Sequence, residues 1–334
     1  LISRDKKVTS IIIYLKKNEK FVKIKKKRED ILNNVINKNN FTEVNNEYKI
    51  EKEKYNEERH ELIDNIRTSL DQANIPYQYF LGGIDMIADD TIKFIKKDIL
   101  IFSITVSIFL IIILFLIFRD LKWVLIPLAS TFYSIIVMMG INGFLNWEIT
   151  AISANFISLM LILSISMNIH IINQYRINTK KNLSSNNLYA TVKNMFFPCL
   201  YTALTTIVAF GSLIFSDIKP VIDFGKIMIV ALLIIFITSF TILPLLISFF
   251  PKINTEQNIN IKKILLFIQL SFAHKIKIII FNILLFIISI VGILNLNVEN
   301  SFINYFKKNT EIFKGMKLID QDLGGTTPLD IIIK

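Results

Sequence analysis

The chain has 334 residues, of which 52% are hydrophobic and only 19% are charged. Its apolar runs are longer than the core strands and helices of a soluble protein need. An ordinary soluble enzyme or binding domain is therefore excluded, and a polytopic α-helical membrane protein is predicted. The net charge of +11 is assigned in part to loops that lie against anionic headgroups, and nucleic-acid binding is not expected.

The first 97 residues carry most of the charge and are predicted to form a soluble domain. Residues 8–15 and 77–81 are rich in strand-forming side chains, whereas residues 26–37 and 51–73 are typical of helices. Strands that alternate with helices favour a small α/β sandwich. We therefore expect residues 1–97 to form an α/β domain.

Six later segments are each apolar over the roughly 20 residues that a bilayer core requires. They are residues 99–118, 124–145, 152–172, 196–215, 227–250 and 276–296. The first five are expected to form one bundle over residues 98–250, which a linker over 251–275 joins to the sixth span. Residues 297–334 are expected to begin a second outer domain, with a helix at 310–320 and a strand at 328–334.

Lysine and arginine in the short loops set the predicted orientation. They gather between spans one and two, three and four, and five and six: Arg119, Lys122, Arg176, Lys180, Lys181, Lys193, Lys252, Lys262, Lys263, Lys275 and Lys277. The other loops have no basic excess. The three basic loops are therefore predicted to be cytoplasmic, and residues 1–97 and 297–334 extracytoplasmic, in a multi-pass protein of the cell's inner (plasma) membrane.

The two ends of the chain are abrupt. The chain begins with Leu1, and its last residues are typical of a strand that stops in mid-course. An outer domain that precedes an inward-going span needs an earlier span to translocate it. We therefore expect a fragment of a longer protein, with a preceding helix missing.

Small and hydroxyl side chains share one side of the fourth span: Cys199, Thr202, Thr205, Thr206, Ala209, Ser212 and Ser216. This side is expected to face protein, while leucine and isoleucine face lipid. Helix packing is the favoured role of Thr202, Thr205 and Thr206. A cation pathway is the alternative role for these three hydroxyl groups.

Four glycines and prolines are expected to matter mechanically: Gly211, Pro220, Gly225 and Pro244. Gly225 is expected to permit close helix contact, Pro220 to begin the approach to the fifth span, and Pro244 to end that span. A hinge for rocking motion is the alternative interpretation.

Several motifs together carry a family resemblance. They are LGGIDMIADDTIKFIKKD, FRDLKW, IHIINQYR, PCLYTALTTIVAFGSLIFSDIKPVIDFG and ENSFINYFKKNTEIFKGMKLIDQDLGGTTPLDI. The chain resembles the resistance-nodulation-division (RND) superfamily over nearly its whole length, specifically the MMPL and sterol-sensing-domain (Patched-like) branch of predicted exporters. The resemblance implies an RND-type helix bundle of twelve spans in two related halves with porter-like outer domains, of which this chain holds spans two to seven.

The family usually couples transport through an acidic residue shortly before the IHxxxxY pattern, and Ser166 stands at that position. The middles of the six predicted spans contain no Asp or Glu. On a helical projection Asn155, Ser166 and Asn173 lie within about 20° of one another, and His170 lies about 40° away. These four residues are therefore the coupling candidates on the third span.

Ser164 and Asn168 point to the opposite side of the same span, so it is polar on both sides. Such a helix is expected in the bundle centre, against the hydroxyl side of the fourth span.

His170 is the one ionisable side chain expected near membrane depth. A structural position at the interface is favoured over a proton-carrying role for it.

Enzymatic features are absent from the sequence. Cys199 is the single cysteine, the three histidines, His60, His170 and His274, are too dispersed for a metal site, and there is no GxxxxGK[ST] motif. No catalysis, metal or cofactor is expected.

The resemblance implies an exporter of a hydrophobic or amphipathic, lipid-like molecule, driven by an ion gradient. Its expected partners are membrane lipids, the hydrophobic substrate and the missing second half of the same chain, and a homo-oligomer is left open. The alternatives are a non-transporting lipid- or sterol-sensing membrane receptor and a scaffold half that supports a coupling-competent one.

Overall fold

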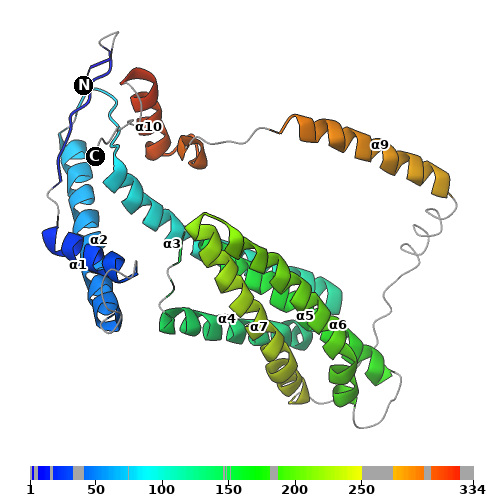
Figure 1. Cartoon of the computed structure of the whole chain (residues 1–334). Coiled ribbons are helices and arrows are strands. Elements are labelled where there is room, and N and C mark those ends of the chain that lie inside the picture. Colours follow the sequence, from blue (N-terminus) through cyan, green and yellow to red (C-terminus); the bar gives the residue numbers. More distant parts are fainter. Residues whose placement is uncertain are drawn as a thin grey trace. The chain divides into compact units, whose positions relative to one another are not determined.

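The computed structural model (Figure 1) describes residues 2–3, 7–15, 18–32, 41–73, 75–145, 147, 149–150, 152–180, 187–249, 274–296 and 302–323. The chain divides into two compact units. The first combines Leu1–Ile92 with Leu270–Lys334, and the second is Lys93–Gln269. The strand predicted at 328–334 and the linker predicted at 251–275, apart from its last two residues, lie outside the described residues.

The second unit is a bundle of long apolar helices. They are α3 (Ile84–Phe118, which crosses the division between the units), α4 (Leu121–Phe144), α5 (Phe156–Lys180), α6 (Asn187–Gly211) and α7 (Lys219–Ser248), with short 3₁₀ turns η2 (Ser153–Asn155) and η3 (Ser212–Phe215). Five of the described helical stretches are long and apolar enough to cross a membrane. They coincide with the first five predicted spans, which confirms a polytopic helical membrane protein.

The sixth predicted span corresponds to α9 (Lys275–Leu294). Among the described residues its apolar helix covers 279–294, which is shorter than the other five spans. A bilayer core needs about 20 apolar residues, so membrane crossing by α9 stays a prediction.

Helices α4, α5 and α7 contact one another and form the core of the bundle, and α6 packs against α5 and α7 (Figure 1). Their inner sides follow the helical period: on α7, Met228, Ala231 and Ile235 are fully buried, whereas Leu233 and Ile237 are about half exposed. One side of α7 therefore packs on protein, and the other offers the apolar surface that lipid requires.

Two of the predicted mechanical residues have a clear place in the packing of α7. A Cβ atom at Gly225 would lie 2.8 Å from the carbonyl oxygen of Phe210 and 3.1 Å from the Cβ of Leu213, so the end of α6 and η3 approach α7 at a point where only hydrogen fits. A Cβ at Gly211 would meet nothing closer than 3.8 Å. Pro220 lies in the first turn of α7, where its missing N–H leaves no bond unmade.

Pro244 does not end the fifth span, contrary to the prediction. Helix α7 continues past it to Ser248. A proline removes one backbone hydrogen bond, but the buried residues Leu243 and Ile247 on either side keep the last turn packed against the bundle.

The first unit contains α1 (Glu19–Leu32), α2 (Phe41–Gln72), the first turns of α3, η4 (Phe302–Tyr305) and α10 (Glu311–Asp322). Asn18 accepts a hydrogen bond from the Phe21 N–H (3.1 Å) at the start of α1. The Phe21 ring then stacks on Tyr55 of α2, with ring centroids 4.7 Å apart. Stacked aromatic side chains of this kind fasten α1 to α2.

The strands predicted at 8–15 and 77–81 do not form within the described residues, where the only pairing is an isolated antiparallel bridge between Ile2 and Thr9. Residues 11–14 are extended and largely exposed. A strand needs a partner strand for its backbone hydrogen bonds, and local composition cannot supply one. The predicted helices at 26–37 and 51–73 correspond to α1 and α2, each of which begins earlier in the chain than predicted. The predicted helix at 310–320 corresponds to α10, and the side chain of Thr310 caps it by accepting the Phe313 N–H.

Candidate functional site

A cavity of about 70 Å³ lies between α5, α6 and α7. Its lining is Leu163, Ser166, Met167 and His170 of α5, Cys199, Thr202, Ala203 and Thr206 of α6, and Leu232 and Ile235 of α7. The fold thus brings together Ser166, His170, Thr202 and Thr206, four of the coupling candidates from the sequence, with Cys199 of the same side of α6. Such a space can hold a few water molecules or part of an apolar group.

His170 is the only imidazole of this lining, whose other polar members are the hydroxyl groups of Ser166, Thr202 and Thr206 and the thiol of Cys199. It lies one turn beyond Ser166 on α5 and is exposed at the cavity side of that helix. An imidazole ring can both donate and accept a hydrogen bond. The cavity therefore combines an imidazole with hydroxyl groups of the neighbouring helix.

The hydroxyl groups of α6 already donate their protons within their own helix. The Oγ1 atoms of Thr202 and Thr206 donate to the carbonyl oxygens of Pro198 (3.0 Å) and Thr202 (2.7 Å). Their lone pairs stay available as acceptors toward the cavity. The two threonines are therefore placed to accept hydrogen bonds from water, from an ammonium group or from a protonated imidazole.

Three other candidates lie outside this cavity. Asn155 is exposed at the end of η2, and Asn173 is exposed on α5. Thr205 is exposed on α6, where its Oγ1 donates to the Tyr201 carbonyl oxygen (3.0 Å). The side of α6 expected to face protein is only partly covered, since Cys199 is buried whereas Thr202 is exposed. The structure therefore divides the sequence-based set into residues at the cavity and residues on the outside of the bundle.

The polar centre of the bundle is a second cluster, in which α5 meets α4 and α7 rather than α6. The Oγ1 of Thr131 lies 2.9 Å from the Oγ of Ser164, and Asn168 Nδ2 donates to Thr131 Oγ1 and to the Pro127 carbonyl oxygen (3.3 Å each). Ser239 Oγ donates to Asn168 Oδ1 at 2.8 Å. Thr131, Ser164, Asn168 and Ser239 are all fully buried, so this cluster joins three helices away from lipid.

The sequence analysis placed Ser164 and Asn168 together and set the third span in the bundle centre beside the fourth, and α5 does pack against α6. It did not identify α4 and α7 as the partners of these two side chains. Thr131, Ser134, Thr238 and Ser239 were not among the candidates. Ser134 Oγ and Thr238 Oγ1 lie 2.6 Å apart, which adds a further contact between α4 and α7. Adjacent hydroxyl residues inside an otherwise apolar span, such as Thr238 and Ser239, would have indicated a protein-facing side.

The first unit has its own polar cluster. Arg67 of α2 donates to both carboxylate oxygens of Asp90 (3.1 and 2.8 Å) and to Glu311 of α10 (3.1 Å). The second Glu311 oxygen accepts the Leu81 N–H at 2.9 Å. The hydrogen bond that Arg67 donates to Asp90 is the main reason that the pKa of Arg67 lies above its ordinary value. Arg67 therefore stays charged and joins α2, the start of α3 and α10.

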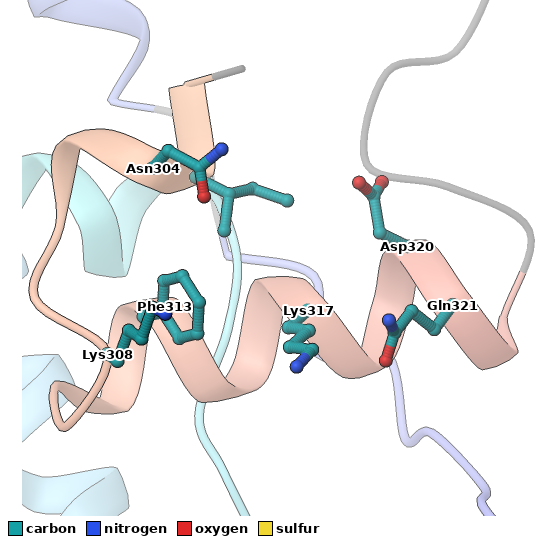
Figure 2. A pocket seen from close by; sticks show the side chains of 7 residues that line it. Asn304, Lys308, Phe313, Lys317, Asp320 and Gln321 are labelled. Atoms are coloured by element: carbon teal, nitrogen blue, oxygen red, sulfur yellow. The ribbon is translucent and has the colours of Figure 1, made fainter. Parts of the chain in front are cut away.

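A larger cavity of about 340 Å³ lies along α10 in the first unit (Figure 2). Its lining is Ile303, Asn304, Lys308, Phe313, Lys317, Asp320 and Gln321. Figure 2 shows Phe313, Lys317 and Gln321 in a row along α10, with Asn304 of the preceding segment above them. The cavity therefore mixes apolar and charged groups, and the sequence analysis had singled out none of its residues.

Within the described ranges, no three His, Cys, Asp or Glu side chains are grouped so that they could hold a metal ion. A family model described as the MMPL family matches residues 45–261, which is more than half of the chain. No curated protein matches the chain. The matched range runs from α2 through the five membrane helices and includes the cavity between α5, α6 and α7.

Proposed function

Because the chain belongs to the MMPL family, whose members are membrane transporters rather than enzymes, we propose that it exports a hydrophobic or amphipathic, lipid-like molecule and draws the energy from an ion gradient. The observation that carries this proposal is the cavity between α5, α6 and α7, in which one ionisable group and several hydroxyl groups meet. In secondary transporters, coupling ions bind where helices that move against each other meet. The cavity lies where α5, α6 and α7 meet, and we propose that these helices move against each other.

His170 is the proposed coupling residue. No carboxylate lines the cavity, and the position where the family usually has its acid is occupied by Ser166. A proton on the imidazole would add a charge beside Thr202 and Thr206, whose free lone pairs would turn toward it. The charge would change how α5 packs on α6, which is the local step that a rocking motion of the bundle requires.

The lining of the larger cavity supports an amphipathic substrate. Ile303 and Phe313 offer apolar contact, while Lys308, Lys317 and Asp320 offer charges of both signs. A ligand with a charged head and an apolar body fits such a lining better than an ion or a sugar does. We propose that this cavity belongs to an extracytoplasmic, porter-like domain and receives the substrate.

The test uses proteoliposomes that hold a pH-sensitive dye and a head-labelled phospholipid. With an imposed pH gradient, the protein should dissipate the gradient and move the label between leaflets, and His170→Gln should abolish both activities. His274→Gln is the matched control, because His274 precedes α9 and does not line the cavity. Equal rates with and without every ion gradient would refute the ion-driven mechanism.

The second candidate function is a lipid-sensing membrane receptor that does not transport. It is favoured by the absence of a carboxylate from the lining of the cavity. A receptor would bind the labelled lipid with a changed helix packing but would move neither label nor protons. Lipid binding without gradient dissipation, in protein that remains folded, would therefore select the receptor over the transporter.

A further inference from the structure

The turn between α3 and α4 holds two cations at one end of the bundle. Arg119 adopts a left-handed backbone conformation (φ 50°), and its N–H donates to the Phe115 carbonyl oxygen at 2.8 Å. Asp120 then caps α4 by accepting the Lys122 N–H at 3.0 Å. The side chains of Arg119 and Lys122 are both exposed on this short turn.

The end of α5 brings a third cation to the same place. The guanidinium carbon of Arg176 lies 5.3 Å from the ring centroid of Phe118 and 6.0 Å from that of Trp123. The neighbouring Tyr175 ring lies 6.0 Å from Trp123. The FRDLKW and IHIINQYR motifs, which are far apart in the sequence, therefore form one structure in which aromatic rings hold a half-buried arginine.

Trp123 carries a buried donor that has no partner. Its side chain is 1% exposed, and its indole Nε1 makes no hydrogen bond within the described structure. Buried indole N–H groups usually find an acceptor. The N–H is closed to the outside, so the donors that an anion can reach here belong to the half-buried Arg176 and to the exposed side chains of Arg119 and Lys122.

We propose that this turn binds the phosphate group of an anionic phospholipid in the adjacent leaflet. Three cations, Arg119, Lys122 and Arg176, outnumber the one carboxylate of Asp120, which accepts the Lys122 backbone N–H and attracts the Arg176 guanidinium. A phosphate has several acceptor oxygens for the arginine fork and for the exposed cations beside it. Basic pockets between membrane helices at the headgroup level are suited to anionic lipids.

The surroundings of the turn select a lipid over a free phosphate ion. Phe115, Leu116 and Leu121 flank the turn and are 50%, 68% and 63% exposed. They lie on apolar helix surfaces where acyl chains would pack. A free phosphate would gain nothing from these side chains, whereas a phospholipid contacts the cations and the apolar surface at once.

The test uses Trp123 as its own reporter. Trp123 and Trp147 are the only tryptophans of the chain, so Trp147→Phe leaves a single fluorophore. The protein is placed in nanodiscs of phosphatidylcholine, and brominated phosphatidylglycerol or brominated phosphatidylcholine is titrated in. Phosphatidylglycerol should quench Trp123 at a much lower mole fraction than phosphatidylcholine does.

Arg176→Gln in the same background should reduce this preference by about tenfold, since a hydrogen bond to a charged group contributes at least that factor. Lys193→Gln is the matched control, because Lys193 is an exposed cation of α6 outside this turn, and it should keep the preference. Arg176→Lys serves if the glutamine variant does not fold, and it should lose part of the preference because lysine lacks the planar fork.

Three results would overturn the proposal. The first is equal quenching by the two brominated lipids, and the second is an unchanged preference in folded Arg176→Gln and Arg176→Lys protein. The third is displacement of brominated phosphatidylglycerol by millimolar inorganic phosphate, which would make the site one for the free ion.

Discussion

The buried cluster around Asn168 makes a quantitative prediction about stability. Asn168 is fully buried and has contacts at 2.8 Å to Ser239 and at 3.3 Å to Thr131 and the Pro127 carbonyl oxygen. Interhelical hydrogen bonds in membrane proteins contribute about 0.6 kcal/mol on average and about 1.7 kcal/mol at most. One short and two long bonds should therefore contribute about 1–2 kcal/mol together.

Asn168→Ala also removes the volume of an amide group from a packed core, which adds about 1 kcal/mol. The free energy of unfolding should fall by about 2–3 kcal/mol in total. The assay is reversible unfolding in mixed micelles as the fraction of denaturing detergent rises. Asn173→Ala is the matched control, because Asn173 is exposed on the same helix, and it should change stability by less than about 0.5 kcal/mol.

A double-mutant cycle with Ser239→Ala separates the hydrogen bond from the loss of volume. The coupling energy between Asn168 and Ser239 should be about 0.6 kcal/mol and should not exceed about 1.7 kcal/mol. A coupling energy of zero, with all variants folded, would show that the two side chains do not bond. An equal loss of stability in Asn168→Ala and Asn173→Ala would refute the placement of Asn168 in the core.

Gly225→Ala should destabilise the bundle by about 1–3 kcal/mol, because the new methyl group meets a backbone oxygen that cannot move aside. Gly211→Ala, measured in the same detergent titration, should be neutral or slightly stabilising, and similar losses in both variants would contradict the close approach at Gly225. Arg67→Gln should destabilise the first unit by about 2 kcal/mol, since it leaves a buried aspartate unpaired at a site that water partly screens. Hydrogen exchange in α10 should then become faster. The control is Lys54→Gln, which removes only an exposed ion pair and should leave hydrogen exchange in α10 unchanged. Unchanged exchange in Arg67→Gln would argue against the link to Glu311.

The positions of the five membrane helices could be predicted because two physical constraints act directly on the sequence. The bilayer sets the length of each apolar run, and the helix must satisfy its own backbone hydrogen bonds within that run. Neither constraint depends on which helices are neighbours. The breaks between the helices at Arg119–Asp120 and before Pro220 also have local causes. At the first break the Asp120 side chain caps α4, and at the second Pro220, which has no N–H, suits the first turn of α7.

The site was only partly predictable. The helical period placed Ser164 with Asn168 and Ser166 near His170 on another side of α5. It could not tell which side meets α4 and α7, because that depends on how the three helices fill space together. The sequence analysis therefore grouped Ser166 and His170 correctly as neighbours on one helix but did not identify α4 and α7 as the partners of Asn168.

What the sequence alone determined is the class of protein, the course of the five described spans and the family, since these rest on length, hydropathy and local motifs. Only the tertiary structure decided that Asn168 bonds to Ser239, that Gly225 permits the contact with α6, and that Arg176 lies over Trp123. It also decided that residues 8–15 form no strand in the described structure. The physical reason is the same in each case: these contacts join residues far apart in the chain, and their free energy depends on partners that no local pattern specifies.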